Sequence, residues 1–154
     1  TILVPIGGGS EAAGISIAAK TLNPHIEVIG VQSDGAPAFY LSWKAGRIVE
    51  TPTINTIADG LATRRAFELT LEIIRDLMDD FILVSDDEIR SAIRLLLSKT
   101  HNVAEGAGAA TTAAAVKLKE RLKGRRVALI LSGGNITLED LWKILSEEPN
   151  PKLV

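Results

Sequence analysis

The fold of this chain is decided by one stretch near its start, Ile2-Leu3-Val4-Pro5-Ile6-Gly7-Gly8-Gly9-Ser10-Glu11-Ala12-Ala13-Gly14-Ile15. It opens as a short apolar run, the pattern of a strand that is buried on both faces. It then passes through three glycines into a segment rich in alanine and isoleucine, which predicts a helix from Ser10 to Leu22. A strand that turns through glycines into a helix leaves backbone N–H groups directed at one spot, where the helix dipole adds positive potential. The turn therefore predicts a phosphate site, although a crowded turn without a ligand would need the same residues.

Composition narrows the classes of function. The chain has 154 residues, 46% of them hydrophobic, which is enough for one domain with its own core. The net charge is −2 without long charged runs, which argues against nucleic acid or an anionic membrane as the main partner. There is no cysteine, and no apolar run reaches membrane-spanning length. We therefore expect a soluble, cytoplasmic protein. Because the sequence starts within a predicted strand and without methionine, we also expect it to be part of a longer chain.

The rest of the chain alternates strands with helices. Further buried strands are predicted at residues 26–32, 81–84 and 127–131, and further helices at 38–45, 66–78, 89–97, about 104–122 and from Thr137 onward. The first strand, the helix after the glycines and the second strand form a βαβ unit, hence parallel strands with a right-handed crossover. The predicted fold class is α/β, a mostly parallel open sheet flanked by helices, with residues 1–154 as a single segment.

Polar residues at three places are candidates for function or for capping. Ser85-Asp86-Asp87-Glu88 match a capping box, which explains these acids better than a cation site does. Glu105 opens an alanine-rich helix, and its carboxylate either serves the helix dipole or faces a pocket. Ser132-Gly133-Gly134-Asn135 follow the last predicted strand, at the edge where open α/β sheets bind ligands. The aperiodic segment 47–63 is a long loop of the kind that is often functional.

A dinucleotide is one candidate ligand for the glycine turn. Gly7-x-Gly9-x-x-Ala12 satisfies the fingerprint of a Rossmann-like NAD-binding module. That fold needs an acid at the end of the second strand, where this chain has Gln32, with Asp34 just beyond. The fingerprint also leaves the stretch after the last strand unexplained.

Five motifs, taken together, resemble a different family. They occupy residues 4–10, 57–60, 83–89, 104–108 and 131–135, and they follow one another in the order and at the spacing found in that family. With them the chain resembles the fold-type II pyridoxal-phosphate enzymes, in particular the threonine/serine ammonia-lyases (dehydratases) and the related serine racemases. The resemblance covers essentially the whole chain as the C-terminal half of such an enzyme. It implies part of the large domain of a tryptophan-synthase-β-like fold.

The resemblance implies a cofactor, pyridoxal 5′-phosphate, and the residues that would hold it. Backbone N–H groups of the turn would bind the phosphate, through Gly7, Gly8, Gly9, Ser10 and Glu11. Ser132 would hydrogen-bond the pyridine nitrogen beside Gly133, and Glu105 would lie on the pocket wall. Ser10 stands where the commonest family form has a fourth glycine, and a serine keeps the N–H. No metal site is expected, because Gln32 and Ala36 stand where a racemase-type cation site needs acids.

The resemblance also implies the reaction. A small hydroxy amino acid such as threonine or serine would lose its Cα proton and β-hydroxyl, giving a 2-oxo acid and ammonia. A hydroxyl opposite the pyridine nitrogen makes the ring a weaker electron sink than a carboxylate would, which favours prompt β-elimination. A serine racemase-type enzyme is the alternative. The family's Schiff-base lysine lies in the N-terminal half, and Ser42-Trp43-Lys44 echoes its motif only superficially. We therefore expect no catalytic residue in this chain, a missing N-terminal half and a homo-oligomer.

Overall fold

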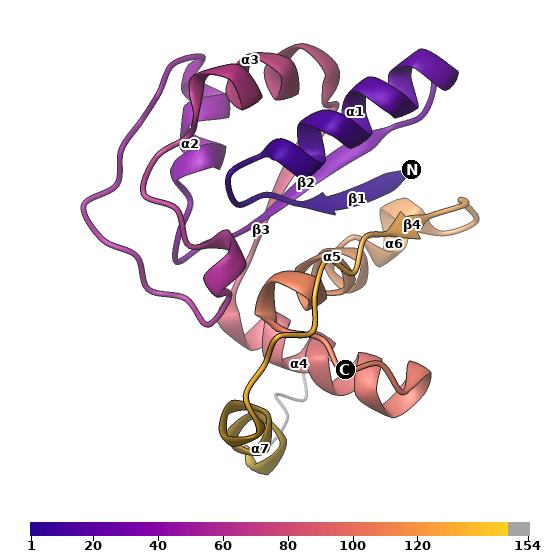
Figure 1. Ribbon diagram of the computed structural model, residues 1–154. Coiled ribbons are helices and arrows are strands. Elements are labelled where there is room, and N and C mark those ends of the chain that lie inside the picture. The colour runs from indigo at the N-terminus through magenta and orange to yellow at the C-terminus, as the bar shows by residue number, and fades with distance from the viewer. Residues whose placement is uncertain (148–154) are drawn as a thin grey trace.

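One parallel sheet runs through the computed structural model, which describes residues 1–147 (Figure 1). Its strands are β1 (Ile2–Pro5), β2 (Val28–Ser33), β3 (Asp80–Val84) and β4 (Ala128–Leu129), in the spatial order β3-β2-β1-β4. All three pairings are parallel, with Leu3 opposite Ile29 and Val31 opposite Ile82. The carboxyl ends of the strands therefore meet at one edge of the sheet, and the predicted α/β class is confirmed.

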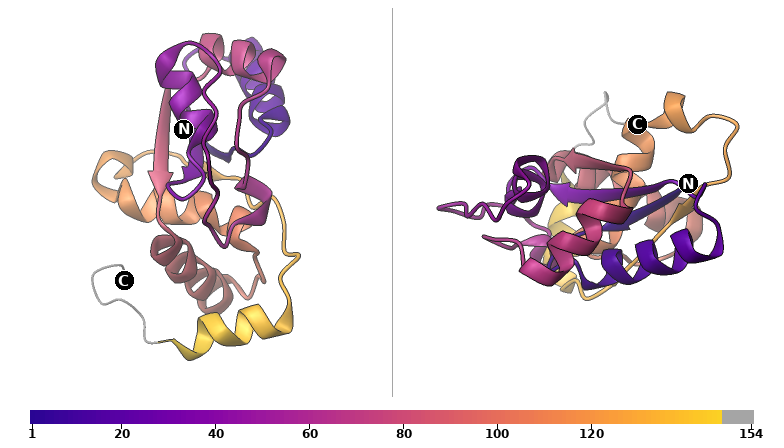
Figure 2. Two further views of the ribbon diagram at one scale, coloured as in Figure 1. Left: turned by 90° about the vertical axis from the view of Figure 1, so that its left-hand side faces the viewer. Right: turned by 90° about the horizontal axis from the view of Figure 1, so that it is seen from above.

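Helices cover both faces of the sheet (Figures 1 and 2). They are α1 (Ser10–Leu22), α2 (Ala38–Ala45), the 3₁₀ turn η1 (Asp59–Leu61), α3 (Glu68–Leu77), α4 (Asp86–Thr100), α5 (Gly106–Lys117), α6 (Lys119–Leu122) and α7 (Leu138–Ser146). Val4 and Val28 pack with α1, α2 and α3, whereas Leu3 and Ile29 pack with α4 and α5. Because successive side chains of a strand point to opposite faces, β1 and β2 supply both cores. The strand β1 is apolar throughout, whereas β2 ends in the buried polar residues Gln32 and Ser33.

Local signals explain why several helices begin and end where the sequence predicts. The helix α1 stops at Asn23, directly before a proline, and Gly46 closes α2 with φ 65°. The capping box of α4 is confirmed: the Ser85 hydroxyl accepts from Glu88 N at 3.3 Å, and Glu88 Oε2 accepts from Ser85 N at 2.7 Å. Thr137 caps α7 as predicted, accepting from Asp140 N at 3.0 Å. The alanine-rich helix differs from the prediction, since it is interrupted between α5 and α6.

The last strand is not the buried strand that the sequence predicts at 127–131. In the structure β4 has two residues, both exposed, and the side chains of Leu129 and Leu131 are 38% and 41% exposed. The reason is its place: β4 pairs only with β1 and forms an edge of the sheet within the described residues. An apolar run predicts a strand, but neighbouring elements decide whether that strand is covered. None of the helices within residues 1–147 is both long and apolar enough to cross a membrane.

Candidate functional site

The three glycines join the carboxyl end of β1 to the first turn of α1. Gly9 is the N-cap residue of α1 and has φ 87°, a left-handed conformation that favours glycine. No side chain caps this helix, so none competes for the N–H groups of its first turn. A Cβ atom at Gly7 would lie 2.1 Å from the carbonyl oxygen of Gly60, so this position has no room for a side chain. The turn is therefore an open helix N-terminus of the kind that binds anions.

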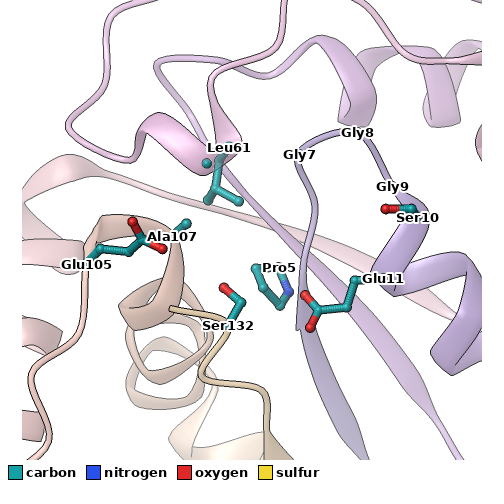
Figure 3. A pocket seen from close by; sticks show the side chains of 11 residues that line it. Pro5, Gly7, Gly8, Gly9, Ser10, Glu11, Leu61, Glu105, Ala107 and Ser132 are labelled. Carbon is teal, nitrogen blue, oxygen red and sulfur yellow. The ribbon is translucent and has the colours of Figure 1, made fainter. Parts of the chain in front are cut away.

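The glycine turn forms one wall of an open cleft (Figure 3). The cleft encloses about 520 Å³ when the space is counted out to the solvent at its mouth. Seven of the eight predicted site residues line it: Gly7, Gly8, Gly9, Ser10, Glu11, Glu105 and Ser132. Pro5, Gly60, Leu61 and Ala107 complete the lining. The fold thus brings together residues from both ends of the chain.

Glu105 and Ser132 lie across the cleft from the glycine turn (Figure 3). Glu105 precedes α5 and makes no capping hydrogen bond with its side chain. Its backbone N–H donates to the carbonyl oxygen of Gly133 at 3.1 Å, which ties the start of α5 to the segment after β4. A Cβ atom at Gly133 would lie 2.0 Å from Glu105 Oε1, so Gly133 allows the carboxylate to lie beside the backbone. Gly133 itself does not line the cleft.

Ser132 lies three residues after the end of the edge strand β4 and is exposed. One alternative role for Ser132 is to cap the last helix. The N-cap residue of that helix is Thr137, five residues later, so capping does not explain the position of Ser132. Its hydroxyl is available on the cleft wall.

The sequence prediction missed Gly60 and Leu61. They belong to the aperiodic segment 47–63, which passes over the glycine turn, where the Thr63 hydroxyl donates to the Gly7 carbonyl oxygen at 3.4 Å. The motif at residues 57–60 was part of the family resemblance, but it gave no indication that Gly60 lies against Gly7. The approach of Gly60 to Gly7 joins distant segments, and periodicity carries no information about such contacts.

The acids at the ends of β2 and β3 form a separate group. Partial burial raises the pKa of Asp34, and the charges of Asp86 and Glu88 raise it further, against the opposing effect of Lys117. Gln32 is fully buried, and its side-chain oxygen accepts from Tyr40 N at 3.0 Å. That oxygen is therefore engaged inside the protein, not offered to a ribose hydroxyl as the dinucleotide alternative requires.

Comparison with known proteins identifies the family. The model of the pyridoxal-phosphate-dependent enzymes matches residues 1–133. The chain belongs to this family. Catabolic L-threonine dehydratase TdcB of Escherichia coli K12 is 44% identical over 145 residues, which are 93% of this chain and 44% of that protein. L-threonine ammonia-lyase of Thermotoga maritima is 38% identical over 146 residues, which are 95% of this chain and 36% of that protein.

Solved structures of family members have the same fold. The crystal structure of the T.th. threonine deaminase has a TM-score of 0.85 and 38% identity, covering 89% of this chain and 46% of that one. The structure of maize serine racemase has a TM-score of 0.84 and 37% identity, covering 94% of this chain and 46% of that one. The predicted family and fold are therefore confirmed. The chain spans less than half the length of these relatives.

Lys44 does not lie in the cleft of this family member. It belongs to α2, and its ammonium lies over the rings of Tyr40 and Trp43, 5.8 Å and 5.6 Å from their centroids. Cation–π contact with solvent-accessible rings is an ordinary surface role for a lysine. Within residues 1–147 there is also no group of three acids or histidines that could hold a metal ion.

Proposed function

We propose that this chain is the cofactor-holding part of a pyridoxal-phosphate-dependent threonine/serine ammonia-lyase. The observation that carries the proposal is the cleft in which the open N-terminus of α1 faces Ser132 (Figure 3). The relatives named L-threonine dehydratase and L-threonine ammonia-lyase support elimination as the reaction. The full-length protein would turn a small hydroxy amino acid into a 2-oxo acid and ammonia, acting as a cytoplasmic homo-oligomer.

The residues of the cleft fit pyridoxal phosphate. A doubly charged phosphate suits the uncapped first turn of α1, where N–H groups from Gly7, Gly8, Gly9, Ser10 and Glu11 can donate to it. The flat ring needs a cleft wall with little side-chain bulk, which Gly60 and Ala107 provide. A ring nitrogen needs a donor across from the phosphate, and Ser132 offers a hydroxyl there.

When bound, pyridoxal phosphate supplies an electron sink for the carbon atom that bears the substrate amine. The role of this chain would be to bind the cofactor and to orient its ring. Ser132 would donate a neutral hydrogen bond to the ring nitrogen and, unlike a carboxylate, would not hold that nitrogen protonated. Glu105 and Gly133 would keep the wall beside the ring in place. The lysine and the base that moves the Cα proton are assigned to the N-terminal half.

A direct assay tests the proposal. The full-length gene product, saturated with pyridoxal phosphate, is given L-threonine or L-serine, and 2-oxo acid, ammonia and D-serine are measured. We expect 2-oxo acid and ammonia in equal amounts. D-serine without elimination would favour the racemase alternative, which the similarity to maize serine racemase also supports. Binding of NAD in place of pyridoxal phosphate would favour the dinucleotide alternative.

A further inference from the structure

Asp86 lies outside the cleft, in the first turn of α4. We propose that it is a positioning residue for the glycine turn: its carboxylate fixes the segment 55–61, and this segment supports Gly7 at the phosphate site. The inference rests on the proposed function, because it concerns how tightly the cofactor phosphate is held. Three sets of contacts link Asp86 to the glycine turn.

The first set joins Asp86 to the segment. Asp86 Oδ1 accepts from the Thr56 hydroxyl at 2.6 Å, and Oδ2 accepts from Ile57 N at 3.0 Å. The Thr56 oxygen in turn accepts from Ala58 N at 3.1 Å. Hydrogen bonds to an ionised carboxylate are about twice as strong as neutral ones. One half-buried side chain therefore holds the Thr56 side chain and the N–H group of Ile57 directly, and the N–H group of Ala58 through the Thr56 hydroxyl. These three residues belong to no helix or strand.

The second set joins the segment to the glycine turn. After Ala58 the chain makes the single turn η1, which brings the Gly60 carbonyl against Gly7. The approach is close enough that a Cβ atom at Gly7 would lie 2.1 Å from Gly60 O. The Thr63 hydroxyl also donates to Gly7 O at 3.4 Å. The backbone that would present N–H groups to phosphate is thus in direct contact, at Gly7, with the segment that Asp86 holds.

The third set closes the other side of the segment. A Cβ atom at Gly106 would lie 2.8 Å from Ala58 Cα, and one at Gly60 would lie 2.8 Å from Ala107 Cβ. The first turn of α5 therefore packs directly on residues 58–60, which lie between α5 and the glycine turn. A shift at Ile57 cannot be absorbed toward α5, because packed atoms are already in contact there. It is transmitted to Gly60 and Gly7.

Capping of α4 does not account for Asp86. The N-cap hydrogen bonds come from Ser85 and Glu88, and both are complete without it. Asp87 offers a matched control, since it shares the first turn of α4 and its favourable dipole interaction. Its carboxylate is exposed and pairs with Arg90 at 2.9 Å, away from the segment.

The test compares two ligands that differ only in phosphate. The full-length gene product and its Asp86→Ala and Asp87→Ala variants are titrated with pyridoxal phosphate and with pyridoxal, which lacks the phosphate. We expect Asp86→Ala to raise the Kd of pyridoxal phosphate at least about tenfold, since two charge-assisted hydrogen bonds are lost. The Kd of pyridoxal should change less than about twofold, and Asp87→Ala should change neither value.

Thr56 provides a second, milder test should Asp86→Ala fold poorly. Thr56→Val removes the hydroxyl and should weaken pyridoxal phosphate alone, whereas Thr56→Ser keeps the hydroxyl and should restore binding. The losses in Thr56→Val and Asp86→Ala should not add up in the double variant, because both substitutions remove the same hydrogen bond between Thr56 and Asp86. An equal loss for both ligands, or no loss, overturns this inference. Failure of the wild type to bind pyridoxal phosphate overturns the proposed function itself.

Discussion

Gly7, Gly8 and Gly9 tolerate a side chain to very different degrees, although they are neighbours. At Gly7 the Gly60 carbonyl oxygen leaves no room, and Gly9 has a positive φ with Phe39 2.8 Å from its missing Cβ. A Cβ at Gly8 would meet only the Phe67 ring, at 3.7 Å, which is ordinary contact. Gly8 is therefore the position where ligand binding and folding can be separated by mutation.

Gly8→Val should abolish retention of pyridoxal phosphate while leaving the fold largely intact. The branched side chain crowds the N–H groups of the turn, yet Gly8 is exposed and a Cβ atom there makes only ordinary contact with Phe67. Cofactor content of the purified full-length variant and its thermal unfolding measure the two effects. Gly14→Ala is the control, since nothing lies within 4 Å of its Cβ position and it should keep the cofactor. Full cofactor content in Gly8→Val would reject the phosphate assignment.

Ser132 is expected to influence the outcome of the reaction. Ser132→Ala should lose about 1 kcal/mol of cofactor binding, the usual value of one neutral hydrogen bond. Ser132→Asp should hold the ring nitrogen protonated and strengthen its electron withdrawal, which favours return of the proton to Cα over loss of the hydroxyl. The ratio of racemisation to elimination, measured with L-serine, should therefore rise in the Asp variant. An unchanged ratio with lowered stability would leave Ser132 a structural role only.

At the scale of elements, a cluster of acidic side chains lies at the same edge of the sheet as the cleft. The turn after β2 and the start of α4 bring Asp34 close to Asp86 and Glu88. Because burial and these charges raise the pKa of Asp34, the folded protein holds its proton more tightly than the unfolded chain does. Stability from this proton is present at low pH and is lost as the pH rises from 3.8 through the higher pKa of the folded state. Near neutral pH the ionised Asp34 therefore lowers stability.

Asp34→Asn should raise the melting temperature at pH 7 and have a smaller effect at pH 3.5. The amide removes the repulsion that the carboxylate experiences at neutral pH, whereas at low pH the wild-type side chain is itself protonated. Thermal unfolding of both proteins at the two pH values measures this. The control is Asp76→Asn, an exposed acid on α3. Equal gains at both pH values would contradict the electrostatic explanation.

Elements with local signals could be predicted from the sequence, and those that depend on neighbours could not. Gly46 ends α2 and Ser85 opens α4 through contacts with residues a few positions away. The exposure of β4 depends on which strand lies beside it, and the run Val127 to Leu131 has no signal for that. The hold of Asp86 on Thr56 likewise joins segments far apart in the sequence. The glycine turn was predictable because its chemistry is contained in one short stretch.

At the scale of the whole molecule, the cleft that residues 1–147 form beside the glycine turn includes no lysine in its lining. The one lysine whose surroundings resemble the family motif, Lys44, lies on α2 outside the cleft. Residues 1–154 expressed alone should therefore show no ammonia-lyase activity. They should also yield no lysine modified by pyridoxal phosphate in unit stoichiometry after borohydride reduction, as read by peptide mass spectrometry. A single trapped lysine together with turnover of threonine would show that this chain carries the complete site.

A crystal structure of the full-length gene product with its cofactor bound tests the proposed cofactor site most directly. We expect the phosphate within hydrogen-bond distance of N–H groups from residues 7–11. We also expect the ring nitrogen about 2.8 Å from Ser132 Oγ, the usual length of such a bond. A phosphate bound elsewhere, or a ring nitrogen that faces a residue other than Ser132, would contradict the proposed site.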